Sequence, residues 1–139
     1  MRRGCANFDG MKHVLFILAL LATPLRAQDA LSDVISDQFR DFAADDFAGA
    51  FDHASPGIQG MFGSADRFGA MVRQGYPMVW RYKSFRLTDQ RPAEDAVYQN
   101  VEVIDADGVA HTLEYKMEQG PMGWKIDGVR LLPPVVPNV

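Results

Sequence analysis

Apolar residues recur at helical spacing at the start of the region that follows the first 27 residues. From Leu31 onward they fall three or four positions apart, which predicts an amphipathic helix with one apolar stripe. The stripe consists of Leu31, Val34, Ile35, Phe39 and Phe42. The opposite side carries an aspartate at every fourth position, which we interpret as a solvated helix face rather than a metal site, because no histidine accompanies it. These residues are Asp29, Asp33, Asp37 and Asp41.

A second, shorter helix is expected after a break in this stripe. The apolar residues from Phe47 to Ala54 keep a helical spacing but would point more than a quarter-turn away from the first stripe, so a new helix must begin. Asp45 is its expected N-cap, since a side-chain carboxylate there accepts a free N–H of the first turn. The run Ser55-Pro56-Gly57 is expected to end this helix.

A third helix is predicted further along the chain, with Ser64 as its N-cap. It carries Phe68, Met71 and Val72 at helical spacing and ends at Gly75-Tyr76-Pro77. The preceding segment, from Ile58 to Gly63, is short and rich in glycine. We assign it no structure.

After Pro77 the period of the apolar residues changes to two, which predicts strands for the rest of the chain. The first strand is expected from about Met78 to Leu87, and a slip in its phase indicates a bulge near Ser84. The second strand places four residues on one face. These are Val97, Gln99, Val101 and Val103.

Two hairpins are expected to join the last three strands. Asp105-Ala106-Asp107-Gly108 predicts the first turn, and Gly120-Pro121-Met122-Gly123 predicts the second. The fourth strand begins at Trp124, changes phase at Gly128 and ends before the proline-rich tail at Pro133-Pro134. On one face of the third strand lie Val109, His111, Leu113, Tyr115 and Met117.

Helices followed by an antiparallel meander predict an α+β domain, with about three helices packed on one face of a four-stranded sheet. The chain has 139 residues and no second composition regime, which fits a single domain over residues 28–139.

Residues 1–27 have the layout of a cleavable export signal. Lys12 and His13 precede nine apolar residues, Val14 to Ala22, and Pro24 follows. This run is too short for a transmembrane anchor, which needs roughly 20 apolar residues. Cleavage is expected between Ala27 and Gln28, and Met11 is an alternative start of translation. We therefore expect a periplasmic or secreted protein without a membrane anchor after cleavage.

Removing this segment changes the chemistry of the chain. The only cysteine, Cys5, leaves with it, so thiol chemistry and disulfides are excluded from the mature domain. Ten basic and 17 acidic residues remain after residue 27, so the net charge changes from −4 to −7. An acidic domain without a basic cluster is not expected to bind nucleic acid.

Four segments of the chain resemble known families. The segment from Phe42 to Phe51 resembles the opening of the nuclear transport factor two-like (cystatin-like) superfamily, whose fold is an α+β cone. With Ala54 to Gln59, Met71 to Pro77 and Gly123 to Val129, it resembles an uncharacterised family of exported bacterial proteins, domain-of-unknown-function family 4864. This resemblance covers nearly the whole mature chain and implies no assigned activity. A short strand that superfamily members often carry between the second and third helices is not apparent, so a shallower cone is expected.

A curved sheet covered by helices can leave a cavity at its open end, lined by apolar side chains and a few polar groups. Five residues combine an aromatic ring with a polar tip and are candidates to line it. They are Tyr76, Trp80, Tyr82, Tyr115 and Trp124. The alternative is that these side chains simply fill a small core.

The two mature histidines suggest little chemistry. His111 stands between apolar neighbours on a strand and is a weak candidate for a general base, whereas His53 is expected near the C-terminus of the second helix. Their spacing is not that of metal ligands, and no phosphate-binding loop or nucleophile elbow occurs, so neither a metal nor a cofactor is expected.

Two functions are compatible with these patterns. The first is a non-catalytic envelope module that binds a small apolar ligand or a protein partner. The alternative is a cofactor-free lyase or isomerase with a histidine or aspartate base, as the cone fold implies. We favour the binding module, because no acid and base pair is visible. Pairing of two copies through the sheet face is left open.

Overall fold

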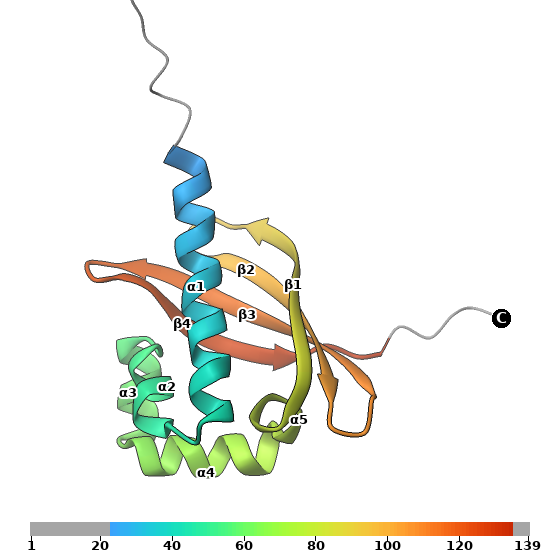
Figure 1. Ribbon diagram of the computed structural model, residues 1–139. Coiled ribbons are helices and arrows are strands. Elements are labelled where there is room, and N and C mark those ends of the chain that lie inside the picture. Colours follow the sequence, from blue (N-terminus) through green and yellow to red (C-terminus); the bar gives the residue numbers. More distant parts are fainter. Residues whose placement is uncertain (1–22, 135–139) are drawn as a thin grey trace, which may run out of the picture.

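The computed structural model describes residues 23–134, with side chains from residue 30 onward. Residues 1–22 and 135–139 lie outside the described residues, and with them Met11, Cys5 and the apolar run of the expected signal. The described part has five helices before the strands (Figure 1). They are α1 (Thr23–Ala43), α2 (Phe47–Asp52), α3 (Pro56–Phe62), α4 (Ala65–Gly75) and α5 (Pro77–Trp80).

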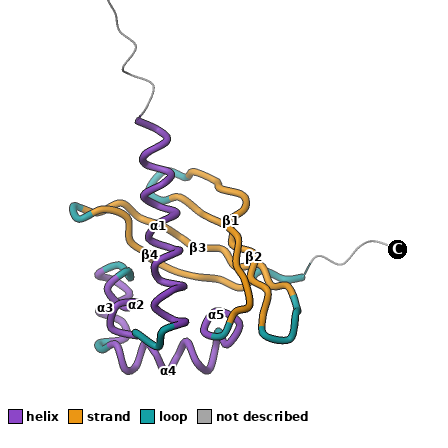
Figure 2. The backbone as a smooth tube through the Cα atoms, viewed as in Figure 1, coloured by secondary structure: helices purple, strands orange, loops and turns teal. Residues whose placement is uncertain are grey.

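The strands form one antiparallel sheet in the order β1-β2-β3-β4. They are β1 (Tyr82–Pro92), β2 (Val97–Asp105), β3 (Ala110–Gly120) and β4 (Gly123–Leu131). Strands that follow one another in sequence are neighbours in the sheet, because each connection is a short turn. Figure 2 shows the helices on one side of the sheet, with α1 running across it. The predicted α+β architecture is confirmed.

The core lies where α1 crosses the sheet. Leu31, Ile35, Phe39 and Phe42 of the predicted stripe are at most 2% exposed, as are Val101 and Val103 of β2 and Leu113 of β3. Phe39 stacks on Phe85 with ring centroids 4.3 Å apart and meets the edge of Tyr82 at 5.4 Å. Burial of one such aromatic side chain stabilises the fold by about 2–3 kcal/mol.

The predicted N-cap of α2 is wrong by one residue. Asp46 is the cap, and its Oδ1 accepts a hydrogen bond of 2.9 Å from the backbone N–H of Gly49. Asp45 instead has a φ of 58°, because the chain must reverse between α1 and α2, and aspartate tolerates the left-handed region better than most residues. The Asp45 carboxylate accepts hydrogen bonds from the Trp80 indole and the Arg81 guanidinium.

Ser55-Pro56-Gly57 begins a helix, whereas the sequence suggested only that it ends one. The helix α2 ends at Asp52, and Ser55 is the N-cap of α3, its Oγ accepting from the Ile58 N–H at 3.2 Å. Pro56 occupies the first helical position, where its missing N–H costs nothing. The helix ends at Gly63, whose φ of 81° suits glycine. The unassigned segment therefore belongs mostly to α3.

The predicted start of the first strand at Met78 is also wrong. Pro77 begins the short helix α5, and β1 starts at Tyr82. The alternation of Met78, Trp80 and Tyr82 coincided with one helical turn, because a period of two cannot be distinguished from helical spacing over so few residues. The chain also pairs beyond Leu87, as far as Pro92.

The predicted irregularities of the sheet are confirmed. The register of β1 against β2 shifts between Tyr82 and Ser84, and β4 carries an unmatched Asp127 beside Gly128. A second register shift of β1, between Leu87 and Gln90, accounts for the polar residue Gln99 on the core face of β2. There the Nε2 of the buried Gln99 donates to the backbone carbonyl groups of Thr88 and Asp89 in the bulge.

The chain between α2 and α3 pairs with the free edge of β4. Ala54 forms an isolated parallel bridge with Ile126, in which the Ser55 N–H donates to the Ile126 carbonyl at 2.8 Å and the Ile126 N–H donates to the His53 carbonyl at 2.9 Å. A short extension of the sheet is thus present where the sequence indicated none. It holds the start of α3 against β4.

Candidate functional site

A cavity of about 230 Å³ lies between four helices and the inner face of β3 and β4. Its lining is almost entirely apolar, and no charged side chain of the described residues takes part in it. From the helices come Gln38, Phe42, Ile58, Met61, Phe62, Phe68, Met71, Val72 and Val79, and from the sheet Tyr115, Ile126, Gly128 and Val129, together with Ala54 and Tyr76.

The helix α3 forms the most exposed wall of this cavity. Ile58, Met61 and Phe62 stand three and four residues apart, so they share the helix face that lines the cavity. No residue of α3 is fully buried, and Met61 is 72% exposed. The wall opposite α3 is the buried sheet face around Tyr115. We therefore place the mouth of the cavity at α3.

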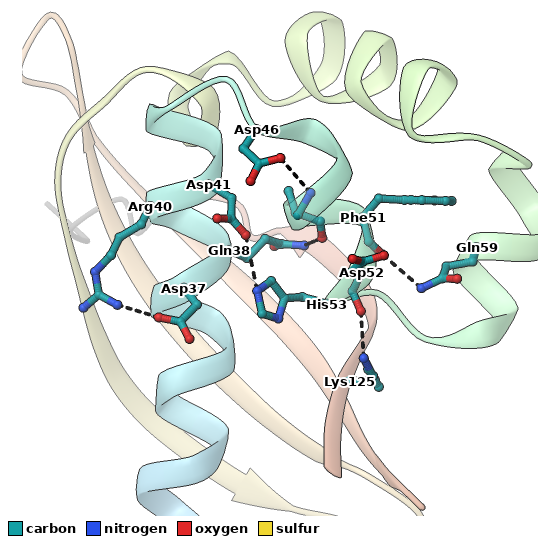
Figure 3. Close-up of polar contacts among 12 residues, drawn as sticks. Asp37, Gln38, Arg40, Asp41, Asp46, Phe51, Asp52, His53, Gln59 and Lys125 are labelled. Atoms are coloured by element: carbon teal, nitrogen blue, oxygen red, sulfur yellow. Dashed lines mark hydrogen bonds and ion pairs between the residues drawn. The ribbon is translucent and has the colours of Figure 1, made fainter. Parts of the chain in front are cut away.

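Polar contacts fasten the end of α2 and the start of α3 to β4. The Ser55 Oγ donates to the Asp127 Oδ1 at 2.7 Å. The Lys125 Nζ donates to the Asp52 carbonyl at 2.7 Å (Figure 3). The Ser55 hydrogen bond and the nearby Lys116 lower the pKa of Asp127 against the opposing effect of burial. These contacts hold the cavity wall near Ala54 and Ile126 in place.

Gln38 contributes a polar group to the cavity wall from α1. Its side chain is 3% exposed, and its Nε2 donates to the Ala50 carbonyl at 3.1 Å (Figure 3). Among the described residues, its Oε1 has no hydrogen-bond donor. The amide atom that donates to the Ala50 carbonyl must be the nitrogen. The atom without a partner is therefore the oxygen, which can only accept a hydrogen bond.

Two tyrosines contribute the other polar groups. The Tyr76 hydroxyl donates to the Val129 carbonyl at 3.1 Å. Tyr115 is 1% exposed, and within residues 30–134 its hydroxyl makes no hydrogen bond. Burial raises the pKa of Tyr115 far above its ordinary value, and the neighbouring Tyr76 raises it further, so the side chain stays a neutral phenol.

One known family covers the part of the chain that builds the cavity. The family described as "Domain of unknown function (DUF4864)" matches residues 25–139, which includes every element that builds the cavity except the start of α1. The chain belongs to this family. No curated protein matches the chain.

Of the five aromatic candidates, two line the cavity of this DUF4864 domain. Tyr76 and Tyr115 do so, whereas Trp80, Tyr82 and Trp124 do not. The Trp80 indole donates to Asp45 at 2.8 Å, and Tyr82 packs against Phe39 and Phe85. Trp124, opposite Gln119 near the β3–β4 turn, is partly buried against the core.

The weak base candidate His111 lies outside the cavity. Its Nε2 is 2.8 Å from the Asp105 Oδ2 at the β2–β3 hairpin, in a shallow groove shared with Pro77, Met78 and Arg81. The hydrogen bond with His111 is the main reason why the pKa of Asp105 is lowered. The Asp105 Oδ1 also accepts from two backbone N–H groups of the turn, so the pair stabilises the hairpin.

His53 is the C-cap of α2, at the helix end where it was expected. Its Nε2 is 3.3 Å from the Asp41 Oδ2 of α1 (Figure 3). Burial raises the pKa of Asp41, and His53 opposes that rise. Asp41 thus departs from the solvated face formed by the exposed Asp33 and Asp37.

The outer face of the sheet carries charged pairs. Glu114 of β3 binds Arg91 of β1 at 3.4 Å and Arg130 of β4 at 3.0 Å. Arg91 also lies 4.5 Å above the ring of Tyr98. The pairing of two copies through this face stays a prediction. No helix of residues 23–134 is long and apolar enough to cross a membrane.

Sequence reasoning missed Gln38 and the whole wall formed by α3. A signal existed for both. Gln38 lies three residues after Ile35 and four before Phe42, so it interrupts the apolar stripe of α1. Ser55-Pro56 is a typical N-cap and first-turn pair, and the apolar residues of α3 follow at helical spacing.

Proposed function

We propose that this domain binds one small, uncharged and mostly apolar molecule in the cavity, without catalysing a reaction. The observation that carries the proposal is an apolar cavity of about 230 Å³ with no charged lining residue among the described ones. Apolar cavities hold water poorly. The lining atoms therefore lack contacts that an apolar ligand would supply.

The enzymatic alternative has less support. A general base must come within hydrogen-bond reach of the proton that it removes. Among the described residues, the cavity lining includes no aspartate, glutamate or histidine, and the raised pKa of Tyr115 makes its hydroxyl a poor base at neutral pH. His111 is engaged with Asp105 elsewhere.

The second part of the proposal concerns location and ancestry. We infer that the domain works in the periplasm or outside the cell, as the basic, apolar and alanine-ended layout of residues 1–27 indicates. The cone-like arrangement of helices on one sheet face supports membership of the nuclear transport factor two-like superfamily. Sequencing the N-terminus of the exported protein tests the location, since it should begin at Gln28. Retention in the cytoplasm with an uncut N-terminus would contradict export.

A matched pair of variants tests ligand binding. Met71→Trp places a large side chain in the cavity, whereas Met122→Trp makes the same change at a turn residue that is 88% exposed. Toluene is a suitable probe, because an engineered apolar cavity of about 150 Å³ already accepts benzene. We expect toluene to raise the Tm of the wild type and of Met122→Trp, and to leave that of Met71→Trp unchanged.

Native mass spectrometry of the exported wild-type protein is the second measurement. A retained small molecule that is absent from Met71→Trp would support the proposal. A wild-type protein that carries no molecule and whose Tm does not respond to toluene would overturn it.

A further inference from the structure

Two buried polar atoms in the cavity wall stand out from the rest of the core. Most buried polar groups in proteins are hydrogen-bonded, and each exception needs a reason. The equally buried Gln99 has partners for both its amide oxygen and its amide nitrogen, and the buried Ser55 hydroxyl both donates and accepts. The Gln38 Oε1 and the Tyr115 hydroxyl have none among the described residues, and both side chains line the same cavity.

The two atoms have different hydrogen-bonding capacities. The Gln38 Oε1 is an amide oxygen and can only accept, while the Nε2 of the same amide donates to the Ala50 carbonyl. The Tyr115 hydroxyl can donate, and its raised pKa keeps the proton in place. A ligand that satisfies both must therefore donate one hydrogen bond and accept another. A hydroxyl is the simplest neutral group that does so.

The size and lining of the cavity restrict the rest of the ligand. At about 230 Å³ it exceeds the cavity of about 150 Å³ that holds benzene, and it leaves little room beyond one ring with small substituents. Three phenylalanine rings and two methionine side chains surround this space, and both kinds of side chain pack well against an aromatic ligand. They are Phe42, Phe62, Phe68, Met61 and Met71.

We propose that the cavity selects a neutral phenol or small cyclic alcohol, whose hydroxyl donates to Gln38 and accepts from Tyr115. This inference rests on the proposed binding function and adds a polar requirement to it. The competing explanation is that ordered water alone satisfies the two atoms. In that case the hydroxyl of a ligand would bring no advantage.

Para-cresol and toluene distinguish these explanations, since they differ by one hydroxyl. Isothermal titration of the folded chain should show para-cresol binding about tenfold more tightly than toluene, as expected for two net hydrogen bonds. In Tyr115→Phe, which keeps only the Gln38 partner, the difference should fall to about threefold. Tyr98→Phe removes the same atom from the outer sheet face, away from the cavity, and should keep the tenfold difference.

Further variants keep the test independent of folding. Without ligand, Tyr115→Phe should leave the Tm unchanged or raise it, because it removes an unpaired buried hydroxyl, whereas Tyr76→Phe should lower it through loss of the bond to Val129. Gln38→Met should likewise lower the preference for para-cresol to about threefold, because the Tyr115 hydroxyl is still present. A preference that stays at about tenfold after this change would overturn the role of Gln38.

The outcomes separate the two proposals. Equal affinity of the wild type for para-cresol and toluene would overturn the hydroxyl requirement and leave the binding function standing. Binding of neither compound would overturn both. A Tyr115→Phe variant that keeps the tenfold difference would show that the Tyr115 hydroxyl is not the partner.

Discussion

The two ends of the space between α1 and the sheet are filled differently. At one end Phe39, which is fully buried, stacks on Phe85 with ring centroids 4.3 Å apart. At the other end the preceding residue, Gln38, faces a cavity. Adjacent residues on one helix thus meet a closed core and an open one, so the difference must arise from what lies opposite them.

The partners of these two residues explain the difference. Opposite Phe39, the strand β1 supplies the aromatic side chains Tyr82 and Phe85. Near Gln38 the most exposed wall of the cavity is α3, a seven-residue helix that buries none of its side chains fully. A short helix with little buried area contributes little stability of its own. The open end is therefore where the fold leaves room for a ligand.

Phe39→Ala should have the largest effect on stability. Truncation of this fully buried ring leaves a cavity in the closed end, and we expect a loss of about 3–5 kcal/mol in the free energy of unfolding. Phe62→Ala, at the mouth of the open end, should cost only about 1 kcal/mol and weaken toluene binding. Urea denaturation measures both. Equal losses would show that the two ends are packed alike.

Ser55→Ala should detach the start of α3 from β4. The change removes the N-cap bond to Ile58 and the hydrogen bond to Asp127, and we expect a loss of about 2 kcal/mol. Ser64→Ala is the matched control, because Ser64 caps α4 and has no second side-chain partner within residues 30–134. This change should cost about 1 kcal/mol. If the control loses as much stability as Ser55→Ala, the bond to Asp127 contributes nothing.

Acid should weaken the same anchor. The pKa of Asp127 is lowered in the folded state, so its stabilising contribution is complete above its unfolded pKa and is lost as the pH falls through the lower, folded value. Denaturation between pH 7 and pH 3 should show a smaller acid loss in Asp127→Asn than in the wild type. Asp41→Asn should show a larger loss, because the raised pKa of Asp41 works in the opposite direction. Identical pH profiles would contradict both assignments.

Gly60→Ala should change stability the least of these variants, and it should increase it. Gly60 lies inside α3, and an added Cβ would meet no atom within 4 Å, so alanine should stabilise the domain by about 0.5–1 kcal/mol. Gly69→Ala in α4 is the opposite case, since its Cβ would lie 2.9 Å from the Phe47 ring and force repacking. A rise in Tm for the first variant and a fall for the second are expected from thermal denaturation.

Much of the fold followed from local patterns. Features that depend on spacing over a continuous segment were predicted correctly. They are the apolar stripe of α1, the cap Ser64 of α4, the strand β3 and the bulge near Ser84. The errors fell where two short elements meet. Asp45 and Asp46 are both good caps by type, and only the reversal of the chain between α1 and α2 decides which one faces the free N–H groups.

The site was predictable only in part. Tyr76 and Tyr115 were among the aromatic candidates, yet nothing local separates them from Tyr82, which packs in the closed end. All three have a ring and a hydroxyl. Their different surroundings depend on contacts between segments far apart in sequence, such as the Tyr76 bond to Val129.

The sequence by itself determined the layered α+β architecture, the acidic and thiol-free composition of residues 28–139, and the residue types available for a site. Periodicity and composition are properties of the chain alone, and the apolar face that the period defines is the face that becomes buried. Only the tertiary structure decided that Ser55 joins α3 to β4, that His111 pairs with Asp105, and that Gln38 and Tyr115 share one cavity. Those outcomes depend on packing between distant segments, where shape and unpaired hydrogen-bonding groups matter more than local pattern.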